Sequence, residues 1–392
     1  MATTDASLSE LLSTKVTAKT VTQVAACTSE ILGLFGFQGN DPGSDGKNVR
    51  RIGHRKFGVD VFNDARTSAM SSAPGTAART TRRQKVARFE GEFPRFYEKL
   101  PLLLDELHNF RRIGGPASEY DDMGKDYVTK QQRYLGQRLA NARLLLTAGM
   151  IRGALYEHQT GDDLFYNFDS VSPISTIDWN IPAGNKSQLN MLSTGNIIDA
   201  DWATAGTNIP LHLANINSAF QNLAGTNLKL ILINSTTWQY IINNTAVARQ
   251  AGTSATPFET FEREVGKGTN GRPLTNQMAT LKACPFYKFV ITDAIIEVPT
   301  SNGSHMTTTT TKLIPDGYAW FGPEPTPELM EMLLGSEPVN EGYGKATSVQ
   351  FGSYAWTKEI DDPACVCMYS LDNAIPVLYV PKATAYARVS GF

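Results

Sequence analysis

The chain of 392 residues is 41% hydrophobic and has a net charge of −2, with 36 Lys and Arg against 38 Asp and Glu. This length predicts two or three domains with a sizeable core, and the balanced charge excludes a protein that binds nucleic acid through its overall charge. Four cysteines are too few for a disulfide framework and favour reduced thiols in an intracellular setting, and no apolar run is long enough to span a membrane.

Residues 1–46 predict an N-terminal arm that cannot form a large core by itself. Two short amphipathic helices are expected, at roughly 8–12 and 21–34. The glycine-rich stretch "GFQGNDPGSDGK" then interrupts the chain. The first residues lack the basic start and apolar run of a signal peptide.

Residues 47–115 predict an extended β-hairpin followed by a link. The stretches "RKFGVDVFND" and "KVARFEGEF" alternate apolar and polar residues, as half-buried strands do. The twenty residues between them, "ARTSAMSSAPGTAARTTRRQ", have hardly an apolar side chain, and "PRFYEKLPLLLDELHNFRRIGG" is interpreted as a short helical link.

Basic residues are concentrated around this hairpin. Residues 47–99 contain 13 Lys and Arg against 5 Asp and Glu, although the whole chain is slightly acidic. An isolated two-stranded hairpin is marginally stable in water, so we expect it to contact a neighbouring copy of the chain. The candidate residues for this contact between subunits are Arg66, Arg79, Arg82, Arg83, Lys85 and Arg88.

Residues 118–160 predict one long helix of roughly 60 Å. Ser118 begins it with a cap, acidic residues follow in the first turns, apolar residues recur at spacings of three and four, and Gly161 ends it. Arg143 and Arg152 exclude a membrane span. We expect the helix to lie across a sheet as a strut with its arginines free for contacts. Three glycines should let other elements pack closely against it: Gly136, Gly149 and Gly153.

The remaining chain predicts a mixture of strands and helices. Residues 163–180 are expected to form a β-hairpin. From 201 to 355, "IPLHLANINSAFQNLAG" and "STTWQYIINNTAVARQAG" predict helices, whereas "LKLILIN", "YKFVITDAIIEV" and "GYAWFG" predict strands. The threonine-rich residues 303–312 are expected to be a loop, and residues 356–392 end in a further strand.

No motif in the sequence predicts catalysis, a metal or a cofactor. The five histidines are widely separated, and "GKGTNGRP" lacks the ending of a phosphate-binding loop. Adjacent carboxylates, such as Asp361 and Asp362, point to opposite faces of a strand. Cys365 and Cys367 share one face of a strand but have no further ligand nearby, so buried thiols are expected there. We therefore predict a protein that is not an enzyme and has no cofactor.

Three stretches resemble a known family, the phage major capsid protein E group. They are "FGVDVFNDARTSA", "FPRFYEKLPLLLDELHNFRRIGG" and "GKDYVTKQQRYLGQRLANARLLLTAGMIRGALY". The order of the predicted elements is similar to that of tailed-bacteriophage major capsid proteins, which have the HK97-type fold. The resemblance implies an α+β fold with an N-terminal arm at 1–46, an extended hairpin at 47–115, a peripheral domain at 116–200, an axial domain at 201–355, and a return to the peripheral domain at 356–392.

The same resemblance implies a function and partners. Pentamers and hexamers of the chain would form an icosahedral shell around double-stranded DNA, which would contact the shell weakly and without sequence specificity. A portal, a separate scaffolding protein and a decoration protein are the other expected partners, assembly would occur in the host cytoplasm, and no membrane is involved. An encapsulin-like compartment and a soluble α/β enzyme are the alternative hypotheses.

Overall fold

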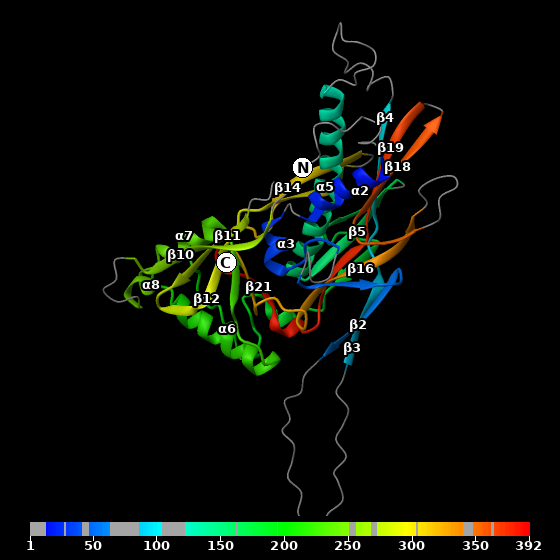
Figure 1. The fold of residues 1–392 in the computed structure, drawn as a ribbon. Helices are drawn as coiled ribbons and strands as arrows, with labels where there is room; N and C mark the ends of the chain where they lie inside the picture. Colours follow the sequence, from blue (N-terminus) through cyan, green and yellow to red (C-terminus); the bar gives the residue numbers. More distant parts are fainter. Residues whose placement is uncertain are drawn as a thin grey trace, which may run out of the picture.

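The computed structural model describes residues 13–26, 29–40, 47–62, 86–103, 122–161, 163–193, 195–250, 256–267, 273–302, 305–339, 348–361 and 364–392. Its helices and strands form a mixed α+β fold, as predicted. Figure 1 shows two regions. One surrounds the long helix α5 (Asp122–Arg152), and the other is a sheet flanked by the shorter helices α6 (Ile209–Ala224), α7 (Ser235–Ile242) and α8 (Thr245–Gln250).

The helix α5 is shorter than the sequence predicts. It has 31 residues, which at about 1.5 Å per residue makes a rod of roughly 46 Å. The prediction of a helix over 118–160 is wrong at its C-terminal end, and residue 118 lies outside the described residues. Gly153 has a φ of +92°, a left-handed conformation that ends the helix, and Ala154–Thr160 then forms strand β5.

Two glycines let other elements approach α5 closely, as predicted. A methyl group on Gly136 would lie 2.7 Å from Cβ of Val24 and 2.8 Å from the carbonyl oxygen of Val21, both on helix α2 (Thr14–Ala26). A methyl group on Gly149 would lie 2.9 Å from Cβ of Leu155. The N-terminal segment therefore packs directly on the long helix through one glycine, and strand β5 packs on it through the other.

We predict that Leu139→Asp destabilises the subunit severely. Leu139 is buried with Val21, Leu102 and Met368. Helix α2 and the strands Phe96–Leu103 and Ala364–Asp372 therefore contact the long helix at this point. The substitution removes apolar packing and places a charge without a partner, which should cost at least about 3 kcal/mol of unfolding free energy. Thermal unfolding measures the loss. Gln137→Asp, at an exposed position of the same helix, is the control, and equal melting temperatures for both variants would contradict this packing.

Two arginines of α5, Arg143 and Arg152, form hydrogen bonds with other segments of the same chain. The prediction that the arginines of this helix are free for contacts between subunits is therefore wrong for these two. The Arg143 guanidinium donates to Asp372 at 2.7 and 3.0 Å, to the carbonyl oxygen of Gly39 at 2.7 Å and to Oγ of Ser353 at 2.6 Å. Arg152 donates to the carbonyl oxygen of Lys312 at 2.7 Å. Arg143 therefore joins the N-terminal segment, the long helix and the C-terminal strands.

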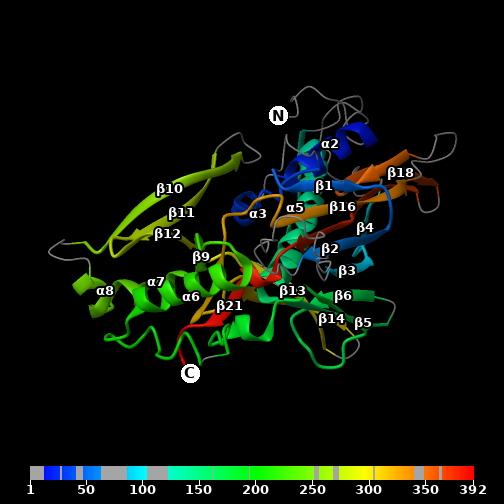
Figure 2. The same cartoon turned by 90° about the horizontal axis from the view of Figure 1, so that it is seen from below.

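The region beside the helices contains a seven-stranded mixed sheet in which both faces are covered. In strand β9 (Leu230–Ile233), Ile231 and Ile233 belong to the core with α6 and α7, whereas Leu230 and Leu232 belong to the core with α5. In Figure 2, α6 and α7 lie along one side of this sheet. The strand order is β10 (Phe258–Lys267), β11 (Pro273–Leu281), β12 (Cys284–Ile291), β9 (Leu230–Ile233), β15 (Tyr318–Gly322), β21 (Ala385–Arg388) and β8 (Lys186–Ser187).

The other sheets are small and surround α5. A four-stranded sheet contains β1 (Val49–Ile52), β16 (Met330–Val339), β17 (Ser348–Phe351) and β20 (Ala374–Leu378), and a three-stranded sheet has the order β18 (Tyr354–Asp361), β19 (Ala364–Asp372), β4 (Phe96–Leu103). A second three-stranded sheet has the order β6 (Asp163–Asn167), β5, β7 (Ser175–Asp178). Two further strand pairs form hairpins: β2 (Lys56–Phe62) with β3 (Val86–Glu92), and β13 (Ile295–Asn302) with β14 (His305–Lys312). The short helices are α3 (Glu30–Phe35), η1 (Ala183–Asn185) and η2 (Pro381–Ala383).

Several local predictions are wrong because pairing with distant strands decides the structure. The expected helical link contains strand β4, which pairs with β19. Strands β6 and β7 both pair with β5 instead of forming a hairpin with each other. The expected threonine-rich loop at 303–312 contains strand β14. The helix expected at 21–34 is divided between α2 and α3, and residues 8–12 lie outside the described residues.

The sheets do not follow the expected domain boundaries. Strand β8 lies before residue 201 and β21 lies after residue 355, yet both belong to the seven-stranded sheet. Strand β16 lies between those residues but pairs with β1 and β20 near the long helix. The chain therefore passes between the two regions more often than expected, and the division into peripheral and axial domains remains a proposal.

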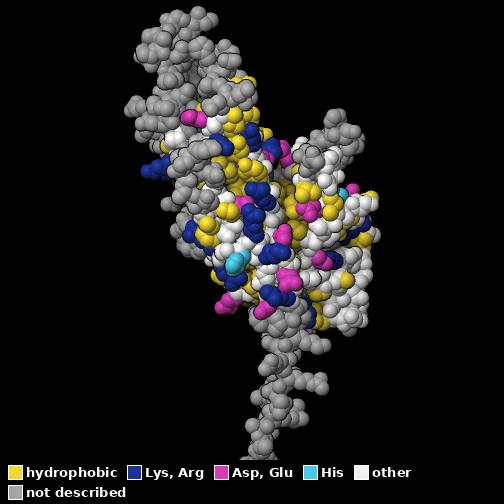
Figure 3. Space-filling model, turned by 90° about the vertical axis from the view of Figure 1, so that its right-hand side faces the viewer, with side chains coloured by type: hydrophobic (Ala, Val, Ile, Leu, Met, Phe, Trp, Pro, Cys, Tyr) yellow, Lys and Arg dark blue, Asp and Glu magenta, His cyan; other side chains and the backbone are white. Residues whose placement is uncertain are grey.

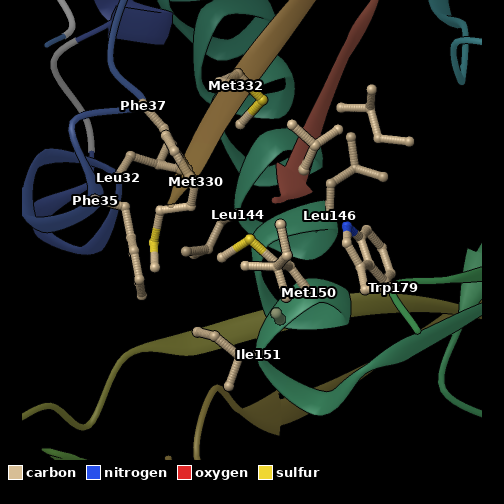
Figure 4. Packing of buried hydrophobic residues seen from close by; sticks show 14 of the residues in the cluster. Leu32, Phe35, Phe37, Leu144, Leu146, Met150, Ile151, Trp179, Met330 and Met332 are labelled. Atoms are coloured by element: carbon tan, nitrogen blue, oxygen red, sulfur yellow. The ribbon is translucent and has the colours of Figure 1, made fainter. Parts of the chain in front are cut away.

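The main core lies where α3, α5 and β16 meet. Figure 4 shows the side chains of Phe35, Leu144, Met150 and Met332 converging from these three elements. Phe35 also contacts the ring of Trp320 in the seven-stranded sheet, with ring centroids 5.4 Å apart. One continuous core therefore joins the N-terminal segment, the long helix and the seven-stranded sheet.

Candidate subunit-interaction surfaces

The extended hairpin of β2 and β3 has one apolar face and one charged face. Phe57, Val59, Val61 and Phe89 are buried on the apolar face, and the ring centroids of Phe57 and Phe89 are 5.1 Å apart. Within the described residues, β2 and β3 pair only with each other. The described part of the hairpin therefore buries its apolar face within its own chain, and a neighbouring copy is not needed to cover it.

A buried carboxylate holds the base of this hairpin. Glu337 on β16 is 5% exposed, and its Oε1 lies 2.6 Å from Nη2 of Arg55 and 3.3 Å from Nη2 of Arg95. Asn373 donates to its other oxygen at 3.3 Å. Arg55 precedes β2 and Arg95 follows β3, so one carboxylate ties both ends of the hairpin to the body.

We predict that Glu337→Gln loosens the base of the hairpin without unfolding the subunit. The amide keeps the shape of the side chain but loses two charge-assisted contacts, each worth about 1.5–3 kcal/mol when fully formed. Because Arg55 and Arg95 are half exposed or more, water can replace part of this lost free energy. Amide hydrogen exchange in β2 and β3 should become faster, whereas exchange in α5 should not change. Glu92→Gln, which alters an exposed pair with Lys56, is the control. Unchanged exchange in the Glu337 variant would exclude the carboxylate as the hairpin's anchor.

The structure describes one of the six predicted contact residues. Arg88 lies exposed on β3, and its Nε is 3.4 Å from Oε2 of Glu90. The other five lie outside the described residues: Arg66, Arg79, Arg82, Arg83 and Lys85. Their contact with a neighbouring subunit stays a prediction.

The basic charge of this region lies at the two ends of the hairpin and not on its strands. Strands β2 and β3 contain two basic and three acidic residues. Residues 63–85 contain five basic residues and one acidic residue. The other basic residues lie before β2 and after β3, where Arg50 pairs with Glu331 and Arg55 with Glu337. Any electrostatic attraction to a neighbour must therefore come chiefly from residues 63–85.

An aromatic ladder lies on the three-stranded sheet of β18, β19 and β4. It consists of Tyr354, Trp356, Tyr369 and Tyr97, whose rings stack with planes 10–21° apart and centroids 5.3–6.2 Å apart. The Arg95 guanidinium lies 4.7 Å from the centroid of Tyr97, which is 44% exposed. Figure 3 shows hydrophobic side chains with Lys and Arg beneath them on this side of the molecule. The ladder therefore presents a partly exposed aromatic surface beside the base of the hairpin.

The two cysteines of β19 lie on the same face of the strand, as predicted. Cys365 and Cys367 are both buried, and their sulfur atoms are 3.5 Å apart. Across the described part of the chain, no group of three or more His, Cys, Asp or Glu side chains is placed to hold a metal ion. The pair therefore packs as buried thiols in the sheet.

A hollow of about 330 Å³ beside α6 is lined by His212 and Asp199, a pair of residue types that also occurs in enzyme active sites. His212 lies 2.9 Å from Asp199 through Nε2, and Trp202 Nε1 donates to His212 Nδ1 at 3.1 Å. Because the indole nitrogen can only donate, Nδ1 must accept, and Nε2 carries the proton that Asp199 accepts. Both ring nitrogens are therefore engaged, and His212 fixes the local fold instead of serving as a free base.

The residues that organise these surfaces were not predicted from the sequence. Glu337 and Asp372 are single carboxylates whose partners are far away in the sequence, so no local spacing predicts them. Tyr354 and Trp356 alternate along a strand, which would have placed both on one face. Their partners Tyr97 and Tyr369 become visible only once the pairing of β4, β18 and β19 is known.

Comparisons with known proteins find no related sequence and only weak similarity to solved structures. No family model matches the chain, and no curated protein matches it. A prophage protein of Escherichia coli CFT073, provisionally described as a capsid protein, is 14% identical with a TM-score of 0.48 over 88% of this chain and 90% of that chain. The mature capsid of bacteriophage PhiM1 is 10% identical, with a TM-score of 0.41 over 88% of this chain and 86% of that chain. The SrpI encapsulin of Synechococcus elongatus PCC 7942 is 9% identical, with a TM-score of 0.40 over 88% of this chain and 85% of that chain.

At these identities and TM-scores, the similarities do not assign a function to this chain. The described elements themselves have the order that the resemblance to HK97-type capsid proteins predicts. An N-terminal segment with two helices comes first. An extended hairpin follows, then a long helix with small sheets around it, a mixed α/β region, and strands that return beside the long helix.

Proposed function

We propose that this chain is a major capsid protein that assembles as pentamers and hexamers into an icosahedral shell. One observation carries the proposal: a charged hairpin is anchored at its base by Glu337 and leads away from the body. Its strands end at Phe62 and Val86, which are paired, so the basic residues 63–85 begin and end beside each other. A segment attached in this way can contact a neighbouring subunit without changing the core of the subunit to which it belongs.

The rest of the structure supplies the stiffness that a thin shell requires. The long helix is fixed by α2 at one position and by the buried Arg143–Asp372 pair at another. Buried charge pairs with satisfied hydrogen bonds favour one arrangement over others, which is the use we propose for Arg143. The aromatic ladder is the proposed surface for a neighbouring subunit, because it offers exposed apolar area beside the base of the hairpin.

Sedimentation velocity tests assembly directly. A free subunit has a mass of 42.9 kDa, whereas a closed shell of many copies sediments far faster. The protein should show capsomers and shells under some condition of salt and concentration. A single species of subunit size under every condition would contradict the proposal.

The contents of the purified particle distinguish the two kinds of shell. A tailed-phage capsid should package double-stranded DNA, whereas an encapsulin-like compartment should contain a protein cargo. Contact with DNA should be weak, should lack sequence specificity and should weaken as salt rises, since exposed basic residues bind phosphates by counterion release. A footprint on one DNA sequence that survives high salt would contradict this.

The remaining partners and the setting follow from the proposed role. A portal, a separate scaffolding protein and a decoration protein are the proposed partners, and assembly in the host cytoplasm into a virion is the proposed location. In the described parts of the chain, no helix combines the length and apolar composition needed to cross a membrane. An α/β enzyme is the competing hypothesis, and a catalytic activity that is lost on substitution of His212 or Asp199 would favour it.

A further inference from the structure

The outer strand of the second hairpin has an open edge. Strand β13 is held against the body by Ile296 and Val298, which are buried, and β14 lies outside it. Among the described residues, β14 pairs with no strand except β13. Thr307, Thr308, Thr309 and Thr310 are all exposed. The backbone groups along the free edge of β14 are therefore available to another strand.

This edge lacks the features that usually prevent strands from pairing. The edge strand β10 of the large sheet provides a comparison within the same chain, since it has three exposed glutamates and a register shift near Glu264. Such charges and irregularities discourage pairing with another chain. In contrast, residues 307–311 are five threonines with no charge, proline or glycine. Threonine also has a high preference for strands.

The run of threonines is symmetric about its centre, which suits a second copy of the same chain. In a two-fold contact, residue i faces residue j of the partner and residue j faces residue i. Neighbouring residues of a strand point to opposite faces, so the axis must pass through a residue and not between two. With the axis at Thr309, all five positions pair threonine with threonine.

We propose that β14 pairs antiparallel with β14 of a second copy across a two-fold axis at Thr309. The two hairpins would then form one continuous four-stranded sheet with the order β13, β14, β14, β13. The inference deepens the proposed function, because an icosahedral shell contains two-fold axes at which two copies meet. The β14–β14 contact differs from the proposed contact of residues 63–85, which belongs to the hairpin of β2 and β3 and needs no two-fold symmetry.

Disulfide trapping tests the pairing and its register. Thr309→Cys is made in a chain with Cys27→Ser and Cys284→Ser, and assembled shells are oxidised and then denatured without reductant. Facing residues have Cα atoms about 4.5–5.5 Å apart, within the range that a disulfide spans. Most of the protein should run as a covalent dimer.

Thr307→Cys in the same background is the matched control. Its partner residue would be Thr311 of the second copy, and the two substituted residues would lie about 14 Å apart along the strands. This variant should give about tenfold less dimer, because a disulfide cannot span that distance. The double variant Thr307→Cys/Thr311→Cys should restore the dimer.

Three outcomes decide the inference. A dimer at position 309, with a background level at positions 307, 308, 310 and 311, supports it, whereas a dimer centred on another of these positions overturns the axis at Thr309. Shells that form normally but give no dimer, or equal dimer at every position, overturn it. If the protein forms no shells, the proposed function fails, and trapping is repeated on the concentrated free protein. A dimer at position 309 alone would still support edge pairing there, whereas no dimer would overturn it.

Discussion

Replacing residues 66–83 with Asn-Gly should leave a folded subunit that no longer closes into shells. Paired residues of β2 and β3 have numbers that add to 148, so Asp64 would face Gln84 across the new turn. Ala65-Asn-Gly is then a three-residue loop with glycine in the left-handed position, a common hairpin connection. The base of the hairpin and its apolar face lie in the described residues and are retained. Circular dichroism and melting temperature should therefore match the parent.

The assembly state of this variant is the decisive measurement. Sedimentation should show free subunits or isolated capsomers where the parent shows shells. Closed shells of normal stability from the shortened hairpin would contradict the proposed role of residues 63–85. Since these residues lie outside the described part of the chain, the experiment also tests the sequence-based expectation independently of the structure.

A charge-reversal variant separates the composition of this segment from its length. Arg79, Arg82 and Arg83 are changed to Glu, and the control changes the same three residues to Lys, which keeps the charge. Single exposed ion pairs contribute less than about 1 kcal/mol, but the contact repeats in every subunit. Assembly of the Glu variant should weaken most at low salt, where repulsion acts over a longer distance. Equal assembly of the two variants would exclude an electrostatic role.

Arg143→Met, in the long helix, should destabilise the subunit severely. Arg143 is 1% exposed and Asp372 is fully buried, so the substitution leaves a carboxylate in the core without its cation. Loss of one partner of a buried pair costs about 3–5 kcal/mol. It also removes the hydrogen bonds to Gly39 and Ser353. The variant should melt far below the parent or accumulate as insoluble protein.

A double substitution shows whether the unpaired charge of Asp372 causes the loss of stability. Arg143→Met/Asp372→Leu removes both charges and should recover a substantial part of the lost stability, since an apolar pair can replace a buried ion pair. Arg133→Met, at an exposed arginine of the same helix, should melt like the parent. If Arg143→Met melted like Arg133→Met, the buried network would contribute nothing to stability.

The sequence predicts this fold best where the local pattern and the tertiary structure agree. The alternation in β2 and β3 places Phe57, Val59 and Phe89 on the buried face, as expected. The apolar spacing identifies α5 and α6, and the close approach at Gly136 agrees with the prediction. The alternation and the apolar spacing depend on residues that are neighbours in the chain, and the missing side chain at Gly136 is visible in the sequence itself.

The predictions fail where pairing over long distances overrides the local pattern. Residues 96–103 resemble a helical link but complete a sheet with β19, which lies some 270 residues further along. The end of α5 depends on the conformation of one glycine, and "ALYEHQT" fits either a helix or a strand until its partners are known. Arg143 looked like one of several surface arginines, because nothing near it in the sequence shows that Asp372 will be its partner.

Electron microscopy of the purified protein is the decisive test of the proposed capsid function. It should show rings of five or six subunits and closed icosahedral shells, in which residues 63–85 of each copy lie against a neighbour. Particles of single-subunit size, or small oligomers that do not close over a wide range of salt and protein concentration, would contradict it.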